Sequence, residues 1–306
     1  MNHKPKMLPF TFKDFQKTFS DDAACLEWLF RYFYPEGTVF CDKCQRETKH
    51  HRVASRPSYS CDFCGNHVHP TANTIFHKST TSLVTWFHAI YLMAQTRCGI
   101  SAKQIQRETG VTYKTAWRMF KQIRSMLCED SGPLGGKGSE GVEMDESYFG
   151  AKRKRGGKRG RPAADSPKQC VVGIAERHGR VVALTSDNAT RANLQGIAKE
   201  RILPATTVFT DEWTGYYGLE KQGYFHKRIN HAEKVYVSGD AHTQTIDGFW
   251  SLVKRGITGV YHNVGKHYLQ SYLNEYTFRY NRRFDVQPMF FSFMNQIEKR
   301  EEVITE

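Results

Sequence analysis

The sequence has no segment that would direct the chain to secretion or hold it in a membrane. Its first six residues, MNHKPK, lack the apolar run of a signal peptide. The longest mostly apolar stretch, residues 83–94, is shorter than the roughly 20 residues that a membrane-spanning helix needs, and it contains a histidine. We therefore expect a soluble, cytoplasmic protein with no membrane partner.

Acidic residues are scarce relative to basic ones. The 306 residues include 31 Asp and Glu against 44 Lys and Arg, which gives a formal net charge of +13 and a pI near 9.3. Such an excess favours a polyanionic partner, because each Lys or Arg that neutralises a phosphate releases a counterion. A solvated basic surface is the simpler alternative, but it does not explain why the charge clusters. The length suggests two domains of ~100–200 residues each.

The cysteine pattern of a secreted disulfide protein is also lacking. Four of the eight cysteines form two C-x-x-C pairs separated by sixteen residues, and the other four are scattered. This spacing is typical of a tetrahedral zinc site, and a hairpin between the pairs would bring them together. The predicted ligands are Cys41, Cys44, Cys61 and Cys64.

Four thiolates would leave no open position on the zinc ion, so the site is expected to be structural. One alternative is that the two pairs are buried free thiols that fall close together by chance. Another is that His67 or His69 replaces one of the cysteines.

Helical patterns dominate the N-terminal part of the chain outside this site. Ser20 is expected to cap a helix with an apolar stripe. Further on, a short helix at 101–108 and a second helix at 113–126, capped by Thr112, are separated by a turn that contains Gly110. This arrangement is a helix-turn-helix pattern.

The second helix of the pair has a basic outer face. The residues expected to contact DNA from it are Lys114, Arg118 and Lys121. An ordinary helical hairpin has the same pattern of lengths, so the basic face and the adjacent zinc module are what favour DNA binding.

A Gly-rich linker at 131–139 marks a change from helical to strand-like periodicity. Three short β-rich runs come first, and helices then alternate with strands. This succession predicts an α/β fold with a mixed sheet. The expected elements are strands at 141–149, 169–175 and 181–186, a helix at 190–201, strands at 206–210 and 225–229, and a helix at 243–255.

Three carboxylates in this part of the chain are placed as a divalent-metal site requires. Asp145 and Asp211 each follow an apolar run where a strand is expected to give way to a loop, and Asp247 lies near the start of the last helix. Clustered carboxylates repel and raise one another's pKa, so a fold keeps them together when cations occupy the cluster. Taken singly, each aspartate could instead be a helix cap or a surface carboxylate.

Other polar residues accompany these aspartates. His242, five residues before Asp247, is an alternative to it in the third position, either as a ligand or as a proton carrier. Lys254, two turns further along the same helical face, would meet a phosphate of bound DNA, or else remain a solvated lysine. Arg255 is expected to face DNA. Glu143 lies on the same strand face as the first aspartate and would be an outer carboxylate of the site.

A strongly basic run lies between the first two strands. Residues 152–161 contain seven basic residues and three glycines, so the run cannot bury itself and is expected to be disordered in isolation. It would act as a phosphate clamp at the mouth of the site, or remain a solvated loop. The residues expected to contact DNA are Lys152, Arg153, Lys154, Arg155, Lys158, Arg159 and Arg161.

In combination, these motifs resemble those of bacterial insertion-sequence transposases of the DDE superfamily, and within it the zinc-ribbon-bearing group related to eukaryotic Merlin elements. The resemblance extends from about residue 20 to residue 283. The segments that carry it are FCDKC at 40–44, CDFC at 61–64, VEMDESYFG at 142–150, FTDE at 209–212, HTQTIDGFWSLVKRGI at 242–257 and YTFRYNRR at 276–283.

The resemblance implies a ribonuclease-H-like catalytic core and a homo-oligomer that binds double-stranded DNA, both the element ends and the target. It also implies cutting and joining that depend on Mg²⁺ or Mn²⁺. We expect Asp145 to bridge two ions, Asp211 to hold one, and Asp247 or His242 to hold the other, while a 3′-hydroxyl attacks the target in line. The superfamily usually has glutamate in the third position, so Asp247 is a departure from its pattern.

The resemblance also suggests a division of the chain. The expected parts are a helical lead-in (1–36), a zinc ribbon (37–75), a helical DNA-binding region with the helix-turn-helix (76–130), a ribonuclease-H-like catalytic domain (140–290) and a C-terminal tail (291–306). The protein would associate with the nucleoid in the cytoplasm. Two rival functions are a DNA-binding regulator with an inactive core and a structure-selective nuclease on the same fold.

Overall fold

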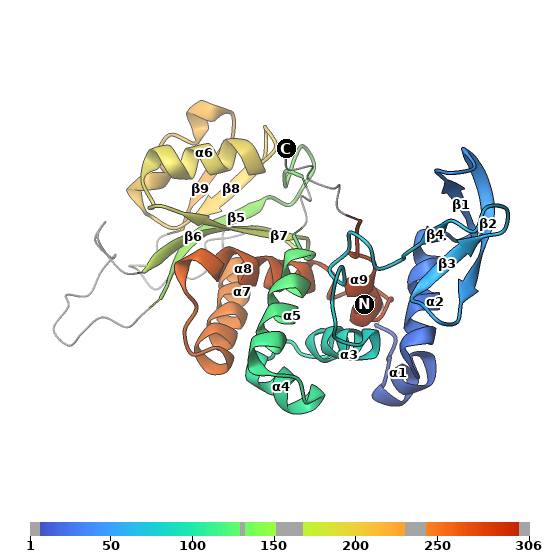
Figure 1. The fold of residues 1–306 in the computed structure, drawn as a ribbon. Helices are drawn as coiled ribbons and strands as arrows, with labels where there is room; N and C mark the ends of the chain where they lie inside the picture. The colour runs from blue at the N-terminus through green and yellow to red at the C-terminus, as the bar shows by residue number, and fades with distance from the viewer. Residues whose placement is uncertain (1–6, 129–131, 151–167, 230–242, 300–306) are drawn as a thin grey trace, which may run out of the picture. The chain divides into compact units, whose positions relative to one another are not determined.

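The computed structural model describes residues 7–128, 132–150, 168–229 and 243–299. The chain forms two compact units, and Figure 1 draws their helices and strands. One unit consists of Met1–Thr96, Ala102–Met126 and Asp285–Glu306, and the other of Arg97–Ser101 and Leu127–Phe284. None of the described helices has the length and apolar character that crossing a bilayer would require.

Two helices, α1 (Phe12–Thr18) and α2 (Asp22–Phe33), open the first unit. The cap of α2 is Asp21, whose carboxylate accepts from the N–H of Ala24 at 2.8 Å. The expectation that Ser20 caps this helix is therefore wrong by one residue. A carboxylate satisfies the first-turn donors as a hydroxyl does, and it also interacts favourably with the positive end of the helix dipole.

A four-stranded antiparallel sheet follows, in the order β1-β2-β3-β4. Its strands are β1 (Thr38–Cys41), β2 (Arg46–Val53), β3 (Ser58–Cys61) and β4 (His67–Val68). β2 and β3 form the hairpin that was expected between the two C-x-x-C pairs. Because β1 and β3 flank β2 on either side, the turns that follow them lie within reach of each other.

Four helices complete the first unit. They are α3 (Leu83–Ala94), α4 (Ala102–Thr109), α5 (Tyr113–Ser125) and α9 (Met289–Met294). α5 begins at the expected cap, Thr112, whose hydroxyl accepts from the N–H of Thr115 at 3.3 Å. The ring of Phe290 in α9 lies 5.6 Å from that of Phe19 and 6.1 Å from that of Tyr91. The end of the described chain thus completes a core built from N-terminal segments.

The second unit is built on a five-stranded mixed sheet in the order β7-β6-β5-β8-β9. Its strands are β5 (Val142–Phe149), β6 (Gln169–Glu176), β7 (Val181–Ser186), β8 (Thr207–Thr210) and β9 (Phe225–Arg228). β6 is antiparallel to both β5 and β7, whereas β8 is parallel to β5 and β9 is parallel to β8. The expected α/β fold with a mixed sheet is confirmed.

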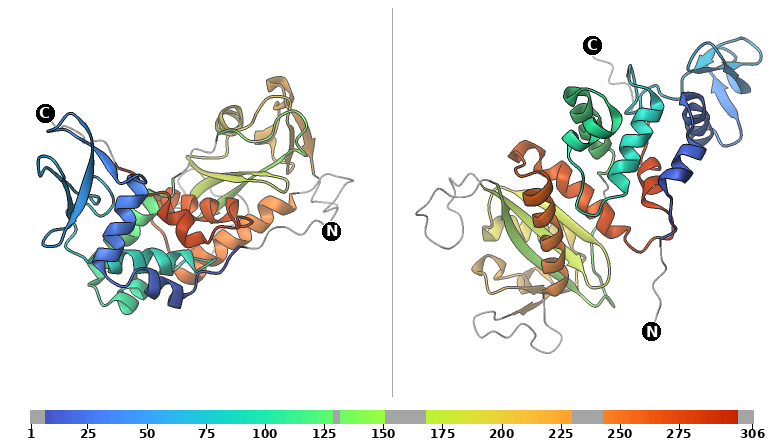
Figure 2. Two further views of the ribbon diagram at one scale, coloured as in Figure 1. Left: turned by 90° about the vertical axis from the view of Figure 1, so that its right-hand side faces the viewer. Right: turned by 90° about the horizontal axis from the view of Figure 1, so that it is seen from below.

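Helices cover both faces of this sheet, as Figures 1 and 2 show. They are α6 (Arg191–Arg201) on one face, and α7 (Gln244–Arg255) and α8 (Lys266–Asn281) on the other. Short turns of helix are η1 (Thr214–Tyr216), η2 (Glu220–Gln222) and the π-helical η3 (Gly256–Val260). Met144 of β5 and Leu194 of α6 belong to one buried cluster, and Ala175, Trp250 and Leu273 to the other.

β8 is shorter than its neighbour β5, and this difference shapes the site. The parallel pairing extends to Glu143 and Phe209, and β8 ends one residue later at Thr210. β5 continues to Phe149 because it stays paired with β6 along its whole length. The second half of β5 therefore runs past the end of the strand beside it.

Candidate functional site

Asp145 and Asp211 lie level with each other at the place where β8 stops. The parallel pair formed by Glu143 and Phe209 fixes the register, and each aspartate comes two residues further along its chain. Asp211 directly follows β8, as expected for a site at a strand end. The expectation that a strand ends at Asp145 is wrong. Asp145 lies within β5, opposite Gly173 of β6, because the antiparallel pairing carries the strand onward.

The carboxylates of Asp145, Glu146 and Asp211 form a compact acidic group, in which one oxygen from each lies within 4.8 Å of the others. Glu146 was not predicted to join this group, since neighbours on a strand point to opposite faces of a sheet. Beyond the end of β8, Asp211 can be approached from both faces. Glu146 accepts a hydrogen bond from the hydroxyl of Tyr216 at 2.6 Å, and Asp211 accepts one from the N–H of Trp213 at 3.0 Å.

Helix α7 brings further side chains toward Asp145. The indole N–H of Trp250 donates to Oδ2 of Asp145 at 2.9 Å. Asp247 lies in the first turn of α7, where it accepts from the hydroxyl of Thr243 at 3.2 Å. It is exposed and outside the compact group, but its charge and that of Lys254 both act on Asp145. The structure therefore brings the predicted site residues Asp145, Asp211, Asp247 and Lys254 to one region.

The surroundings raise the pKa of Asp145 to about 7. Burial is the largest cause, and the charges of Asp211 and Asp247 add to it, whereas the hydrogen bond from Trp250 and the charge of Lys254 lower it. A carboxylate in such surroundings is stabilised by a cation beside it. Because the donors are carboxylate oxygens, the residues present fit a hard divalent ion such as Mg²⁺.

Two residues that sequence reasoning missed hold α7 against the sheet. The ring of Trp250 is packed in the core, where the residue is 2% exposed, and its N–H also reaches Asp145. A Cβ on Gly173 would lie 2.5 Å from Cζ2 of Trp250 and 2.7 Å from Cδ1 of Ile246. A glycine inside a strand often marks such a close approach, so this signal was present in the sequence.

Glu143 was expected to be an outer carboxylate of the site. It is completely buried, and its carboxylate accepts from the backbone N–H groups of Thr245 and Ile246 at the start of α7. These two contacts connect the strand of Asp145 to the helix of Asp247.

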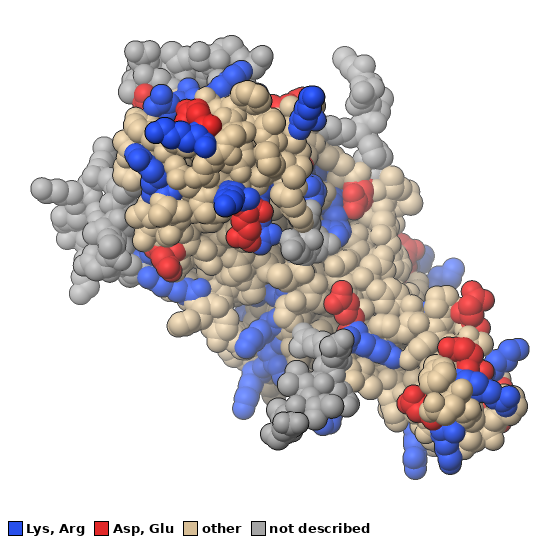
Figure 3. Space-filling model, turned by 90° about the horizontal axis from the view of Figure 1, so that it is seen from above, with Lys and Arg blue, Asp and Glu red and all other residues tan. Residues whose placement is uncertain are grey.

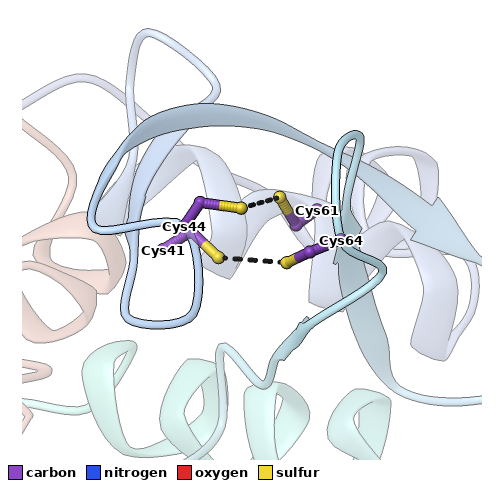
Figure 4. Close-up of side chains that lie close together, drawn as sticks. All are labelled: Cys41, Cys44, Cys61 and Cys64. Atoms are coloured by element: carbon purple, nitrogen blue, oxygen red, sulfur yellow. Dashed lines mark hydrogen bonds between the residues drawn. The ribbon is translucent and has the colours of Figure 1, made fainter.

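The four cysteines of the two C-x-x-C pairs come together beside β1 and β3, as Figure 4 shows. The Sγ atoms of Cys41 and Cys64 are 3.5 Å apart, and those of Cys44 and Cys61 are 3.9 Å apart. Sulfurs placed ~2.3 Å from one tetrahedral Zn²⁺ would be about 3.8 Å from each other. The thiols therefore already have the spacing of a structural zinc site.

The thiols of this cluster differ in acidity. The hydroxyl of Thr48, 3.3 Å from Sγ of Cys61, lowers the pKa of Cys61 to about 6. The contact with the thiol of Cys64 raises the pKa of Cys44 to about 12. Four neighbouring thiolates repel one another, and a bound dication would remove that repulsion.

The alternative zinc ligands, His67 and His69, lie outside this group of four sulfurs. Nδ1 of His67 is 2.9 Å from the hydroxyl of Ser58, and Nδ1 of His69 is 3.3 Å from the carbonyl oxygen of Pro57. Among the described residues, the group that fits zinc is thus made by the cysteines alone.

The basic side chains that were expected to contact DNA from α5 lie on its outer face. Lys114, Arg118 and Lys121 are all exposed, whereas Ala116 and Phe120 on the opposite side of the helix are buried. On the face of the molecule drawn in Figure 3, Lys and Arg side chains are widely distributed, and Asp and Glu side chains lie between them.

Arg255, another expected DNA contact, is exposed at the end of α7. The remaining predicted site residues lie outside the residues that the structure describes. They are His242, Lys152, Arg153, Lys154, Arg155, Lys158, Arg159 and Arg161.

Known proteins are similar to this chain. Residues 134–281 match the family model of the ISXO2-like transposase domain, and this range includes β5, β8 and α7. An uncharacterized protein in transposable element ISH50 of Halobacterium salinarum is 28% identical over 280 residues, which cover 86% of this chain and 92% of that protein. An uncharacterized transposase-like protein of Haemophilus influenzae is 28% identical over 102 residues, which cover 33% of this chain and 81% of that protein. These matches support an insertion-sequence transposase of the DDE superfamily.

Proposed function

We propose that the chain is an active DNA transposase, in which the carboxylates around Asp145 hold divalent cations for the cutting and joining of DNA. The observation that carries this proposal is the convergence of Asp145 and Asp211 from two parallel strands, level with each other and beside a helix that presents Asp247. The raised pKa of Asp145 supports it, because a cluster of this kind favours bound cations. The match to the transposase family supports DNA as the substrate.

Each of these residues has a proposed role. Asp145 and Asp211 bind the cations, and Asp247 is the third acidic residue, with His242 as the alternative. When bound, Mg²⁺ or Mn²⁺ would polarise the scissile phosphate and increase the acidity of the attacking hydroxyl or water. The indole N–H of Trp250 fixes the orientation of the Asp145 carboxylate. Lys254, exposed on α7, binds a DNA phosphate near the reacting one.

We further propose that the second unit is a ribonuclease-H-like domain. The support comes from its strand order and directions, since three antiparallel strands are followed by two parallel ones with helices on both faces. The strands that carry Asp145 and Asp211 are neighbours near the middle of this sheet. Such a position suits residues that must be held rigidly.

The first unit is proposed to bind the ends of the element. The spacing of its four thiols supports a zinc ribbon. α4 and α5 are separated by a turn in which Gly110 has a φ of +73°, and the exposed cations of α5 support a helix-turn-helix that contacts DNA phosphates. Action as a homo-oligomer on paired ends is an expectation from the family resemblance.

The test is a reconstituted reaction of the full chain with the inverted-repeat ends of its element, a target plasmid and Mg²⁺, in which cleavage and strand transfer are scored separately. Asp145→Asn and Asp211→Asn should each lower both reactions by at least ~10²-fold, the scale of losing one stabilising group at a reaction centre. End binding should persist. Asp187→Asn, which changes an exposed aspartate just after β7, is the matched control and should react as the wild type does.

Cleavage at a near wild-type rate by Asp145→Asn or Asp211→Asn would refute the assignment of the site. End binding by the wild type without any metal-dependent cleavage would favour a DNA-binding regulator. Cleavage of junctions or hybrids without strand transfer would favour a nuclease. Either of the last two results would contradict the proposed transposition.

A further inference from the structure

A buried ion pair lies close behind the acidic group. Glu143 in β5 is 0% exposed, and the side chain of Arg177, which directly follows β6, is 8% exposed. Nε of Arg177 lies 3.4 Å from Oε1 of Glu143. Burying two charges carries a desolvation penalty, and the attraction between the charges often does not offset it. A gain in folding stability therefore does not explain why these two residues are paired here. Their other contacts indicate a role for the pair.

Glu143 caps α7 from outside the helix. Its Oε2 accepts from the N–H groups of Thr245 and Ile246 at 2.8 and 3.0 Å, and its Oε1 accepts from the hydroxyl of Thr245 at 3.0 Å. Within the described part of the chain, the N-cap residue Thr243 forms no side-chain cap of its own and donates its hydroxyl to Asp247. First-turn N–H groups need an acceptor, and a carboxylate there also interacts favourably with the helix dipole. α7 thus depends on β5 for its cap.

Arg177 extends this connection to β8. Its guanidinium carbon lies 3.7 Å from the centroid of the Phe209 ring. Phe209 is paired with Glu143 across the parallel strands and precedes Asp211 by two residues. The ion pair therefore contacts β5, β8 and α7, which are the three elements that carry the aspartates.

The placement of α7 decides which side chains reach Asp145. Trp250 must present its indole N–H to Asp145, and Asp247 must lie near enough for its charge to act there. A helix rises 1.5 Å and turns about 100° per residue, so a slip of α7 by one residue would break the bond from Trp250 and displace Asp247. The cap supplied by Glu143 fixes the helix against such a slip.

We propose that Glu143 is a positioning residue, which fixes the rotation and height of α7 so that Trp250 bonds to Asp145 and Asp247 lies near it. Arg177 holds the carboxylate of Glu143 against the start of the helix. The effect on catalysis rests on the proposed function, whereas the placement of α7 can be measured without any reaction.

Two double variants of the full chain separate the cap from the charges. Glu143→Gln with Arg177→Met removes both charges and keeps an amide oxygen for the N–H groups of α7. Glu143→Met with Arg177→Met removes the charges and the acceptor, and leaves an apolar pair. Neither variant leaves one buried charge without its partner, which would by itself destabilise the fold. Glu176→Gln is the matched control, because that carboxylate accepts from the backbone N–H of Gly135 and does not touch α7.

Hydrogen exchange of the Thr245 and Ile246 amides, measured without added Mg²⁺ or Mn²⁺, is the first readout. The double variant with Glu143→Gln should exchange these amides as the wild type does. The double variant with Glu143→Met should exchange them at least ~10-fold faster, because one lost hydrogen bond has about that effect. The second readout is the Mg²⁺ concentration for half-maximal cleavage. This Mg²⁺ concentration should rise ~10–100-fold in the double variant with Glu143→Met, the usual effect of losing a partner that orients a metal ligand. End binding should not change.

Equal exchange rates in the two double variants would overturn the inference. Half-maximal cleavage by the double variant with Glu143→Met at the wild-type Mg²⁺ concentration would overturn it as well. If that variant does not fold, Glu143→Asp replaces it, since it keeps both charges but shortens the reach to α7 by one methylene. Faster exchange of the same two amides is then expected, and wild-type exchange would overturn the inference. If the wild type joins no DNA, the proposed function fails, and the exchange readout still decides whether Glu143 positions α7.

Discussion

The two metal-fitting clusters of this protein are assembled in different ways. The paired cysteine sulfurs are separated by 17 and 23 positions along the chain, and they lie in turns beside one small sheet. The bond from Trp250 to Asp145 joins residues 105 positions apart, and the site around the acidic group draws on β5, the end of β8 and α7. The first cluster is a local feature that holds its own sheet together, whereas the second exists only when a whole domain has folded.

The clusters also differ in how much of an ion they would enclose. Four thiols provide all the ligands of a tetrahedral zinc, which leaves no position for a substrate. A few carboxylates leave positions open for water and phosphate on a hard cation. We therefore expect loss of a cysteine to cost folding, and loss of an aspartate to cost reaction but not folding.

The largest effect is expected from Cys44→Ser. Structural zinc contributes on the order of 10–16 kcal/mol of apparent binding free energy to small folded modules, so losing one ligand should unfold the four-stranded sheet. Zinc content measured by mass spectrometry should fall to background, and protease should cut within residues 37–75. Cys128→Ser, which changes an exposed cysteine outside the cluster, should keep both zinc and resistance. Full zinc content in Cys44→Ser would show that the cluster is not the zinc site.

Asp211→Asn should have the opposite effect on folding. It removes one of the charges that raise the pKa of Asp145, so the unfolding free energy without added Mg²⁺ should stay the same or rise by up to about 1 kcal/mol, the size of one screened like-charge contact. Thermal unfolding with zinc bound and no added Mg²⁺ provides the measurement. A marked loss of stability would mean that Asp211 has a structural role comparable to that of the cysteines.

Gly173→Ala tests how closely α7 must approach the sheet. The added Cβ would lie 2.5 Å from Trp250 and 2.7 Å from Ile246, so overpacking should destabilise the domain by about 1–3 kcal/mol. Urea unfolding gives this value. Gly196→Ala in α6, where a Cβ would meet nothing within 4 Å, is the control and should be neutral or slightly stabilising. Equal stability of the two variants would contradict the close packing at Gly173.

The smallest effects should come from Arg118→Ala and Lys121→Ala, which alter neither cluster. If each side chain contacts one phosphate, each substitution should reduce the slope of log affinity against log salt concentration by ~0.9. Stability should change by less than about 0.5 kcal/mol, since both residues are exposed. Lys199→Ala on the exposed side of α6 is the control. Unchanged slopes for both variants would remove α5 from the DNA-binding surface.

The sequence was informative where the decisive contacts are local. The spacing of the cysteines predicted their cluster, and Thr112 marked the start of α5, because a cap and its helix lie within a few residues of each other. Alternation of apolar residues located the strands of the mixed sheet. Asp145 was identified, and the expected strand at 141–149 matches β5, but the aspartate lies inside that strand and not at its end.

The contacts that could not be predicted join residues far apart in the chain. Glu143 lies 102 positions before Thr245, and only the folded sheet brings its carboxylate to the start of α7. The ring of Trp250 belongs to the core, as an aromatic residue in an amphipathic helix suggests. Its N–H bond could not be predicted, because that bond depends on where Asp145 lies in space. Glu146 joins the acidic group because β8 ends early beside β5, and a single sequence does not show which strands pair or in what register.

The early end of β8 has a consequence for how this domain can drift during evolution. In most sheets the backbone lies between the side chains of the two faces. Substitutions in the helices on one face then do not affect the helices on the other. Here Asp211 is reached from one face by Glu146, which Tyr216 holds, and from the other by Asp145, which Trp250 holds. Substitutions in the layer of α6 and η1 are thereby tied to those in the layer of α7, and neither layer can be remodelled without a matching change in the other.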